Sequence, residues 1–276
     1  MARQRRGMAS LLRLSRCHTV NLQFASRWKN IEYPGVETLP VLNSDSCAAS
    51  GVAGVRKPLL SELFSRLAQV ARTRGIPYFG FINSDVILLR EMIEEVNRGR
   101  HECYMASRKD MDAEGKLADG YLVQGVDLWI MSVGFHEREG WRLPAAIVGE
   151  FGGDNLCASI ALTHGDGFLI NHRTVCLHET HENRWINSPF AEYNHLQCIR
   201  QGYYFSAWAR YIAAISAQNA INQSDAEVRR LQQSCFGRKP GWVDHALCKL
   251  KLAKWKLIYW SKRKASLRDR TIEGVP

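Results

Sequence analysis

The amino-acid sequence predicts an α/β fold, with a mixed central sheet flanked by helices and a helical C-terminal extension. Three observations support this prediction. Apolar runs of strand length alternate with segments of helical periodicity over the first two-thirds of the 276 residues. Beyond Pro189 the pattern is helical alone. The composition, 46% hydrophobic and 23% charged, is that of an ordinary soluble globular protein.

The first predicted elements are two short strands and a long helix. Residues Thr19–Ala25 alternate polar and apolar side chains, and Val36–Leu42 form a second strand that runs into the polar loop Asn43–Ser46. Apolar residues then recur at helical spacing over Leu60–Ala71. This helix leads into the apolar run Ile76–Leu89, which we expect to be one strand buried on both faces. The helix and the strands around it predict a β-α-β arrangement.

The rest of the chain continues the alternation and ends in helices. A polar loop is expected at Met111–Gly120, and Asp154 is expected to be the N-cap of a helix. Residues 125–127 are expected inside a strand. The other expected strands are Glu102–Ser107, Val123–Val133 and Phe168–Leu177, and the other expected helices are Glu91–Val96, Tyr203–Ala220 and Ser224–Cys235.

The distribution of charge divides the chain into three parts. The formal net charge is +10. Residues 1–16 are a basic leader with five Arg and no acid, and residues 244–270 carry nine Lys or Arg against two Asp. We therefore expect a core domain at 17–190 and a helical extension with a basic aromatic tail at 191–276. We expect no nucleic-acid partner, because an enzyme of nucleic acids usually spreads basic charge over its working face.

Cysteine usage and hydropathy indicate the cellular setting. The eight cysteines include no C-x-x-C pair, so we expect neither a disulfide scaffold nor a structural zinc site. Reduced thiols indicate a cytoplasmic protein. No run approaches the roughly 18 apolar residues that span a bilayer. Arg13 and Arg16 interrupt the segment that would be the apolar part of a signal peptide.

Polar residues gather near the carboxyl ends of the predicted strands, where open α/β sheets hold their ligands. They are Asn83-Ser84-Asp85, Gly152 to Asn155, and the pair His178 and His181. Each cluster alone also has a structural explanation, because a carboxylate after a strand is often a turn or helix cap. A lone carboxylate such as Asp85 suits a hard divalent cation that itself binds phosphate. The three clusters together indicate nucleotide-phosphate chemistry, without a P-loop or a dinucleotide fingerprint.

Five short motifs occur in order between Leu60 and His181. They are Phe81-Ile-Asn-Ser-Asp-Val-Ile, Ser107-Arg-Lys-Asp110, Gly125-Val-Asp-Leu-Trp-Ile, Val148-Gly149 followed by Asp154-Asn155, and His178-Glu-Thr-His181. In this order they resemble the nucleotide-sugar-dependent glycosyltransferases of the GT-A fold, and most closely a bacterial branch in which N-x-D replaces the D-x-D motif. The resemblance implies a GT-A-like, Rossmann-related domain. Its implied activity moves a sugar from a nucleoside-diphosphate donor to a glycan or lipid-linked acceptor.

The resemblance also implies a divalent metal, Mn²⁺ or Mg²⁺. Asp85 matches the last Asp of D-x-D, which binds the metal that neutralises the diphosphate. Either His178 or His181 matches the histidine that completes the metal shell, and an imidazole suits Mn²⁺ better than Mg²⁺. Asn83 stands in place of the first Asp, so the site has one negative charge fewer. Asn83 and Ser84 are implied to contact the donor.

Other implied roles concern the acceptor and the leaving group. Asp154 matches the acidic residue near a helix start that faces the acceptor, and in inverting relatives it is the general base. Glu150 is a rival for this role. Arg108 and Lys109 fall where a cation would hold the diphosphate, and Asp127 is implied to bind a sugar hydroxyl. A surface ion pair and a strand-end cap are the alternatives for these residues.

The C-terminal tail combines a helical stripe of apolar residues with many lysines. The stripe consists of Ala246, Leu250, Ala253, Leu257 and Trp260. It fits a packed helix with a solvated basic face, and it also fits a contact of residues 244–264 with an anionic membrane surface. The second interpretation suits a lipid-linked acceptor and a protein at the inner face of the membrane.

Two other functions are compatible with the sequence. One is a metal-dependent phosphohydrolase that uses Asp85 with His178 or His181. The other is a non-enzymatic module with basic ends that binds membranes or nucleic acid. The first would cleave phosphoesters without a sugar acceptor, and the second would bind with a steep dependence on salt.

Overall fold

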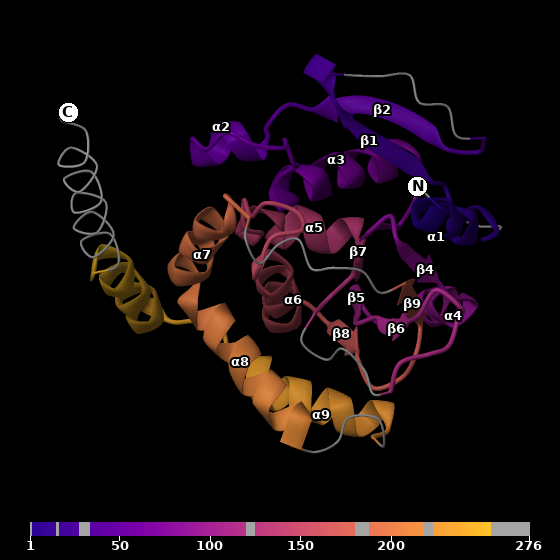
Figure 1. Cartoon of the computed structure of the whole chain (residues 1–276). Helices are drawn as coiled ribbons and strands as arrows, with labels where there is room; N and C mark the ends of the chain where they lie inside the picture. Colours follow the sequence, from indigo (N-terminus) through magenta and orange to yellow (C-terminus); the bar gives the residue numbers. More distant parts are fainter. Residues whose placement is uncertain are drawn as a thin grey trace, which may run out of the picture.

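The computed structural model describes residues 2–14, 17–27, 34–119, 125–179, 188–217 and 223–254, and it is a mixed α/β structure (Figure 1). The strands are β1 Val20–Phe24, β2 Glu37–Leu42, β3 Tyr78–Ile82, β4 Val86–Leu88, β5 Cys103–Ala106, β6 Lys109–Met111, β7 Leu128–Ser132, β8 Gly167–Ile170 and β9 Cys176–Glu179. The α-helices are α1 Ala2–Leu12, α2 Ser46–Ser50, α3 Leu60–Thr73, α4 Arg90–Asn97, α5 Val133–Glu139, α6 Gly153–His164, α7 Ala191–Arg200, α8 Gly202–Ala217 and α9 Asp225–Phe236. Residues 242–254 are also helical.

The main sheet is mixed. In the described part of the chain it has four strands in the order β3-β7-β5-β8. β7 pairs antiparallel with β3 and β5, whereas β5 pairs parallel with β8. The strands β3, β5 and β8 therefore run in one direction. Their carboxyl ends lie at one edge, where Ile82 and Ala106 are both in register with Leu128 and Ala106 is in register with Ile170.

Each of these three parallel strands continues beyond that edge into a second, smaller sheet. β3 leads to β4 through residues 83–85, β5 leads to β6 through residues 107–108, and β8 leads to β9 through residues 171–175. Among the described residues the second sheet has the order β4-β9-β6. β9 pairs antiparallel with β4 and parallel with β6. All three connections thus run between the main sheet and the second sheet.

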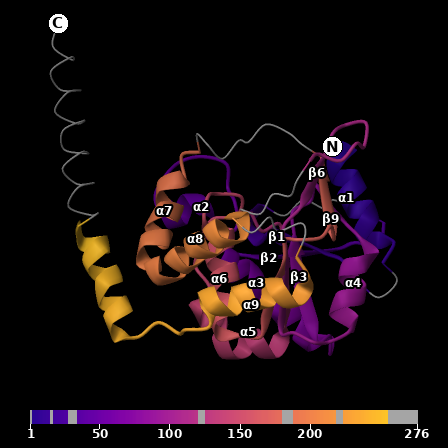
Figure 2. The same cartoon turned by 90° about the horizontal axis from the view of Figure 1, so that it is seen from below.

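Apolar side chains are buried on both faces of the main sheet. On one face, Phe79, Met105 and Leu169 belong to a cluster with residues of α3, α5, α6 and α8. On the other face, Tyr104 and Phe168 belong to a cluster that includes residues of α4, β4 and α9. Helices thus cover the sheet on both sides. Figures 1 and 2 both place α1 and α4 on one side of the molecule and α7, α8 and the 242–254 helix on the other.

Several predictions of secondary structure are confirmed. The strands β1, β2 and β5 and the helices α3, α4, α8 and α9 occur where the sequence predicts them, within a few residues. The start of α9 shows why: the Ser224 side chain accepts a hydrogen bond from the Glu227 backbone, and the Glu227 side chain accepts one from the Ser224 backbone. This capping box is encoded within four residues of sequence.

Two long strand predictions are wrong in the same way. Ile76–Leu89 is not one strand but β3 and β4, which belong to different sheets and are joined by a turn at residues 83–85. Phe168–Leu177 likewise spans β8, a turn and part of β9. β3 is also an edge strand of the main sheet, and on it Phe79 is buried whereas Gly80 is exposed. Both segments bend, because the first half of each pairs in the main sheet and the second half pairs in the second sheet.

Four smaller predictions are corrected. Residues 125–127 precede β7 instead of lying inside a strand. The N-cap of α6 is Gly152, whose φ of 84° favours glycine, and Asp154 lies in the first turn of the helix. β1 and β2 pair with each other in a separate parallel sheet, so β2, α3 and β3 do not form a β-α-β unit within one sheet among the described residues. Lys109–Met111 is a strand, β6, although a polar loop was expected from Met111.

Candidate functional site

The connections between the two sheets carry a continuous series of charged contacts. Asn83, which follows β3, donates from Nδ2 to Asp127 Oδ1 at 3.3 Å. Arg108, which follows β5, donates from Nη1 to the same Asp127 oxygen at 2.6 Å. The Nε of Arg108 donates to Asp110 Oδ1 at 3.0 Å. Residues that are far apart in the sequence therefore meet at the carboxyl edge of β3 and β5.

His178 extends this series into the second sheet. It lies on β9 and is in register with Val86 of β4 on one side and with Asp110 of β6 on the other. Its Nδ1 is 2.9 Å from Asp110 Oδ1, and its Nε2 is 3.5 Å from Asp85 Oδ2. The buried imidazole is thus held between two carboxylates, an arrangement that fixes the orientation of the ring.

Asp127 and Arg108 form the electrostatic centre of the site. Burial raises the pKa of Asp127, and the positive charge of Arg108 offsets part of this rise. Burial lowers the pKa of Arg108, but the charges of Asp127 and Asp110 outweigh it and raise the pKa overall. Asp127 Oδ2 is buried and, among the described residues, has no hydrogen-bond partner. A buried acceptor without a partner is unusual in proteins and marks Asp127 as a candidate for function.

Asp154 lies at the same edge because of how α6 is connected. The helix leads into β8 through residues 165–166, so its N-terminal end lies where β8 ends. Burial raises the pKa of Asp154 from 3.8 to about 6. Hydrogen bonds from the Asn155 and Val126 backbones lower this pKa, and the negative charge of Asp127 raises it. Asp154 and Asp127 are therefore close enough to interact.

The structure brings most of the predicted site residues together. Asn83, Asp85, Arg108, Asp127 and His178 belong to one series of contacts. Asp154 is coupled to this series through the charge of Asp127.

Three expected residues take other positions. Lys109 precedes Asp110 along β6 and pairs with Leu177, so the pleat turns its side chain to the opposite face of the sheet. Ser84 is exposed. Glu150 is buried, and its Oε1 accepts hydrogen bonds from Lys57 Nζ and Ser188 Oγ, both at 2.6 Å. His181 lies outside the described residues.

Asp110 is a member of the site that the sequence analysis did not single out. It contacts both Arg108 and His178 and so joins the two halves of the series. Its spacing of two residues from Arg108 is the available signal, because residues two apart on a strand share one face. That signal depends on recognising β6, which is only three residues long.

The N-terminal helix α1 packs against the turn that carries Asp85. A Cβ at Gly7 would collide with the Ser84 carbonyl oxygen and would lie 2.9 Å from the Val86 carbonyl oxygen. Ser10 Oγ accepts a hydrogen bond from Leu88 N at 3.0 Å. Arg6 forms an ion pair with Glu179, the neighbour of His178. The segment expected to be a basic leader therefore supports the site directly.

The residues present fit a divalent cation as a partial set of ligands. Within the described ranges, no group of three or more His, Cys, Asp or Glu side chains is arranged to hold a metal ion. Asp85 and His178 offer an oxygen and a nitrogen that face each other. A cation that binds nucleotide phosphates needs only one or two protein ligands, because water and phosphate supply the others. The contact of His178 with Asp110 is typical of a metal-ligating histidine.

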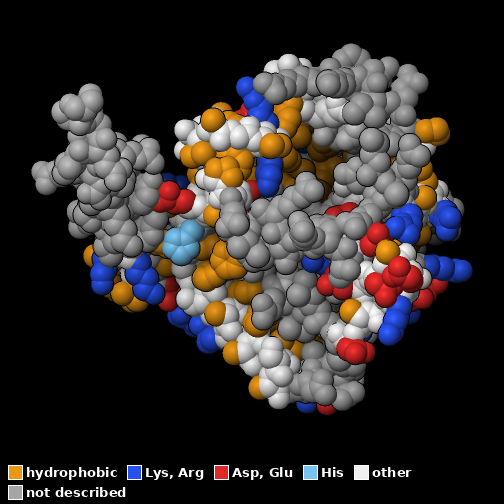
Figure 3. All heavy atoms as spheres, in the orientation of Figure 1, with side chains coloured by type: hydrophobic (Ala, Val, Ile, Leu, Met, Phe, Trp, Pro, Cys, Tyr) orange, Lys and Arg blue, Asp and Glu red, His pale blue; other side chains and the backbone are white. Residues whose placement is uncertain are grey.

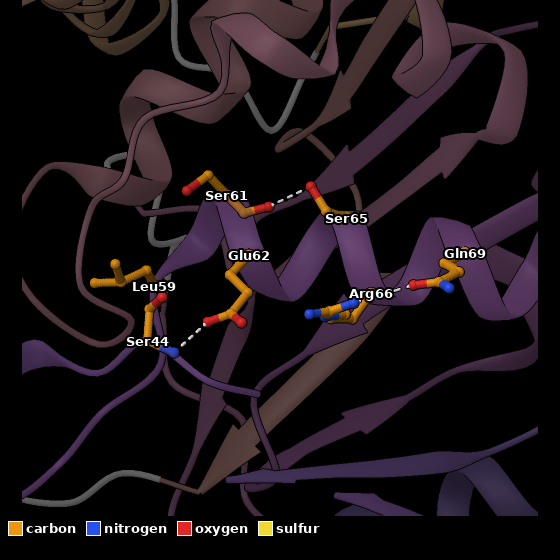
Figure 4. Close-up of a pocket in the computed structure, with 7 residues that line it drawn as sticks. All are labelled: Ser44, Leu59, Ser61, Glu62, Ser65, Arg66 and Gln69. Carbon is orange, nitrogen blue, oxygen red and sulfur yellow. Dashed lines mark hydrogen bonds between the residues drawn. The ribbon is translucent and has the colours of Figure 1, made fainter. Parts of the chain in front are cut away.

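A pocket of about 310 Å³ lies elsewhere, on α3 (Figure 4). It is lined by Ser44, Leu59, Ser61, Glu62, Ser65, Arg66 and Gln69. Glu62 accepts hydrogen bonds from the backbones of Asn43 and Ser44 at 2.8 and 2.9 Å. Its carboxylate therefore caps a loop, and none of the described candidate residues lines this pocket.

A scan against protein-family models found no match, and no curated protein sequence matches this chain. Within the part of the chain that the structure describes, no helix is both long enough and apolar enough to cross a membrane. Each of the eight cysteines lies in a described range and is a free thiol.

Proposed function

We propose that this protein is a metal-assisted glycosyltransferase of the GT-A type. It would transfer a sugar from a nucleoside diphosphate to a hydroxyl of a glycan or lipid-linked acceptor. The observation that carries the proposal is the continuous series Asp85, His178, Asp110, Arg108 and Asp127 at the carboxyl ends of parallel strands. This is where an α/β sheet binds nucleotides. The free thiols accord with a cytoplasmic setting, which is part of the same proposal.

Asp85 and His178 would hold the cation in this proposal. A bound divalent cation would supply charge stabilisation to the departing nucleoside diphosphate. Asp110 orients His178 by accepting a hydrogen bond from its Nδ1. Asn83 in place of an aspartate leaves the site one negative charge lower, and its amide instead holds Asp127.

Arg108 acts mainly as a positioning residue in this arrangement. Two carboxylates already pair with its guanidinium, so little of its charge remains for a diphosphate. Its contact fixes Asp127 Oδ1 and leaves the buried Oδ2 open to accept a hydrogen bond from a sugar hydroxyl. A buried acceptor that needs a partner discriminates strongly against sugars that lack the matching hydroxyl.

Asp154 would remove the proton from the acceptor hydroxyl. A general base works best when its pKa is near the working pH. The pKa of about 6 makes Asp154 largely deprotonated at neutral pH and more basic than an ordinary aspartate. The rise has the cause found in other buried catalytic carboxyls, namely burial with a second carboxylate nearby.

A metal-dependent phosphohydrolase is the second candidate, and Asp110 favours it. With Asp110 the structure places three carboxylates, those of residues 85, 110 and 127, around His178 and Arg108. Such an enzyme would use water in place of a sugar acceptor. It would also cleave nucleotides that carry no sugar.

Release of nucleoside diphosphate from UDP-, GDP- and CDP-sugars in Mn²⁺ tests the proposal. We expect release from one donor class, faster when lipid or glycan acceptors are added, and lost in Asp154→Asn. Asp119→Asn, an exposed aspartate on the 112–119 loop, is the matched control and should keep the wild-type rate. Cleavage of sugar-free nucleotides at an equal rate would support the hydrolase. Absence of release from every donor would contradict both enzymes.

A further inference from the structure

The helix at residues 242–254 exposes a broad apolar face. At about 100° per residue, most of its apolar side chains fall on one arc of the helix, which Ala246 and Ala253 also share, whereas Cys248 and Leu252 lie on the other side. We call this arc the tail face. Its four large apolar members are well exposed: Trp242 at 82%, Val243 at 48%, Leu247 at 51% and Leu250 at 67%.

The opposite face attaches the helix to the rest of the protein. Cys248 is buried, and its Sγ lies 3.3 Å from the position that a Cβ on Gly202 of α8 would take. Asp244 accepts hydrogen bonds from Gly241 N at 2.8 Å and from Arg238 Nη2 at 2.9 Å. A surface helix normally turns its apolar stripe to the core. This helix turns it outward, where a partner can cover it.

Positive charge borders the tail face. Lys249 and Lys251 lie on its two sides, Lys254 lies at its end, and all three are exposed. Figure 3 shows hydrophobic and basic side chains next to each other on this side of the molecule. The sequence continues over residues 255–264 with Trp255, Tyr259, Trp260 and four Lys or Arg, without an acidic residue.

We propose that the tail face docks on an anionic lipid membrane. Apolar side chains with aromatic residues would enter the headgroup boundary, and the bordering lysines would contact lipid phosphates. A second copy of the chain fits less well, because it would bring two lysine borders together. The 242–254 helix, which carries the tail face, lies on the opposite side of the molecule from α1 (Figures 1 and 2). This inference is independent of the proposed glycosyl transfer.

Vesicle co-sedimentation of the full chain tests the proposal. Vesicles of phosphatidylcholine alone are compared with an equimolar mixture of phosphatidylcholine and phosphatidylglycerol. We expect binding to the mixture only, and a fall of about tenfold or more in Leu247→Ser/Leu250→Ser. Lys249→Gln/Lys251→Gln should weaken binding about thirtyfold at low salt. Both pairs are exposed, so an unchanged thermal midpoint is expected and verifies folding.

Trp141→Ala is the matched control for Trp242→Ala, because Trp141 is 74% exposed elsewhere on the surface. The tail-face variant should lose vesicle binding and the control should keep it. Wild-type binding by the leucine pair variant would overturn the proposal, as would equal binding to both vesicle types or binding to neither. Analytical ultracentrifugation gives a further test. A dimer that the leucine variant converts to a monomer would identify a second copy, and not lipid, as the occupant.

Discussion

Replacement of Asp154 by Asn is expected to stabilise the protein at neutral pH and to abolish the proposed sugar transfer. Burial raises the pKa of Asp154 from 3.8 to about 6, so folding disfavours its carboxylate form. At about 1.4 kcal/mol per pKa unit, this rise corresponds to about 3 kcal/mol. Asp154 keeps part of its surface exposed, and solvent screens some of this effect. We therefore expect a net gain of about 1–2 kcal/mol from the neutral amide.

The pH dependence has a definite sign. An unfolded chain releases the Asp154 proton near 3.8, whereas the folded protein holds it until about 6. The free energy of unfolding of the wild type therefore falls as the pH rises through this range, and the loss persists above it. Asp154→Asn removes this contribution, so its advantage should be present at about pH 8 and absent at about pH 4.

Urea unfolding at these two pH values measures the difference, with Asp119→Asn as the exposed control. The control should change the free energy of unfolding by less than about 0.5 kcal/mol at either pH. The reasoning is refuted if Asp154→Asn is less stable than the wild type at the higher pH. It is equally refuted if the two proteins differ by the same amount at both pH values.

Three further substitutions test the supports of the site. Arg108→Met should destabilise the protein by about 3 kcal/mol or more, because it leaves buried Asp127 without its cation. Urea unfolding measures this change, and a loss below about 1 kcal/mol would contradict the reasoning. Gly7→Ala should cost about 1–3 kcal/mol through collision with the 83–86 turn, whereas Gly134→Ala in α5, where a Cβ has room, should be neutral or stabilising. Ser224→Ala should lower the thermal midpoint through a loss of about 1 kcal/mol at the α9 capping box, and an unchanged midpoint would show that the cap contributes nothing.

Local signals made part of this fold predictable. The apolar spacing of α3 and the Ser224 cap of α9 are encoded over a few consecutive residues, so one sequence is enough to find them. Asn83, Asp85 and His178 were also predictable, because polar residues near strand ends mark the edge at which ligands bind. Asp127, expected inside a strand, was implied by the resemblance alone.

The remaining features depend on contacts between distant parts of the chain. A continuous apolar run such as 76–89 does not reveal that its two halves pair in different sheets. The pairing of Arg6 with Glu179 joins two residues that are 173 positions apart in the sequence, and nothing local to α1 indicates it. Asp110 was missed for a related reason. It contacts His178, which is far away in the sequence, only because β6 pairs with β9.

The most direct test of the proposed site is the thermal midpoint with nucleoside-diphosphate sugars, with and without Mn²⁺. We expect stabilisation of the wild type that requires both the metal and one class of sugar nucleotide. Asp85→Ala and His178→Ala should each abolish it, and Asp112→Ala, in the turn after β6, should retain it. Stabilisation that survives Asp85→Ala unchanged, or that is the same without Mn²⁺, would contradict the assignment of this cluster as the donor site.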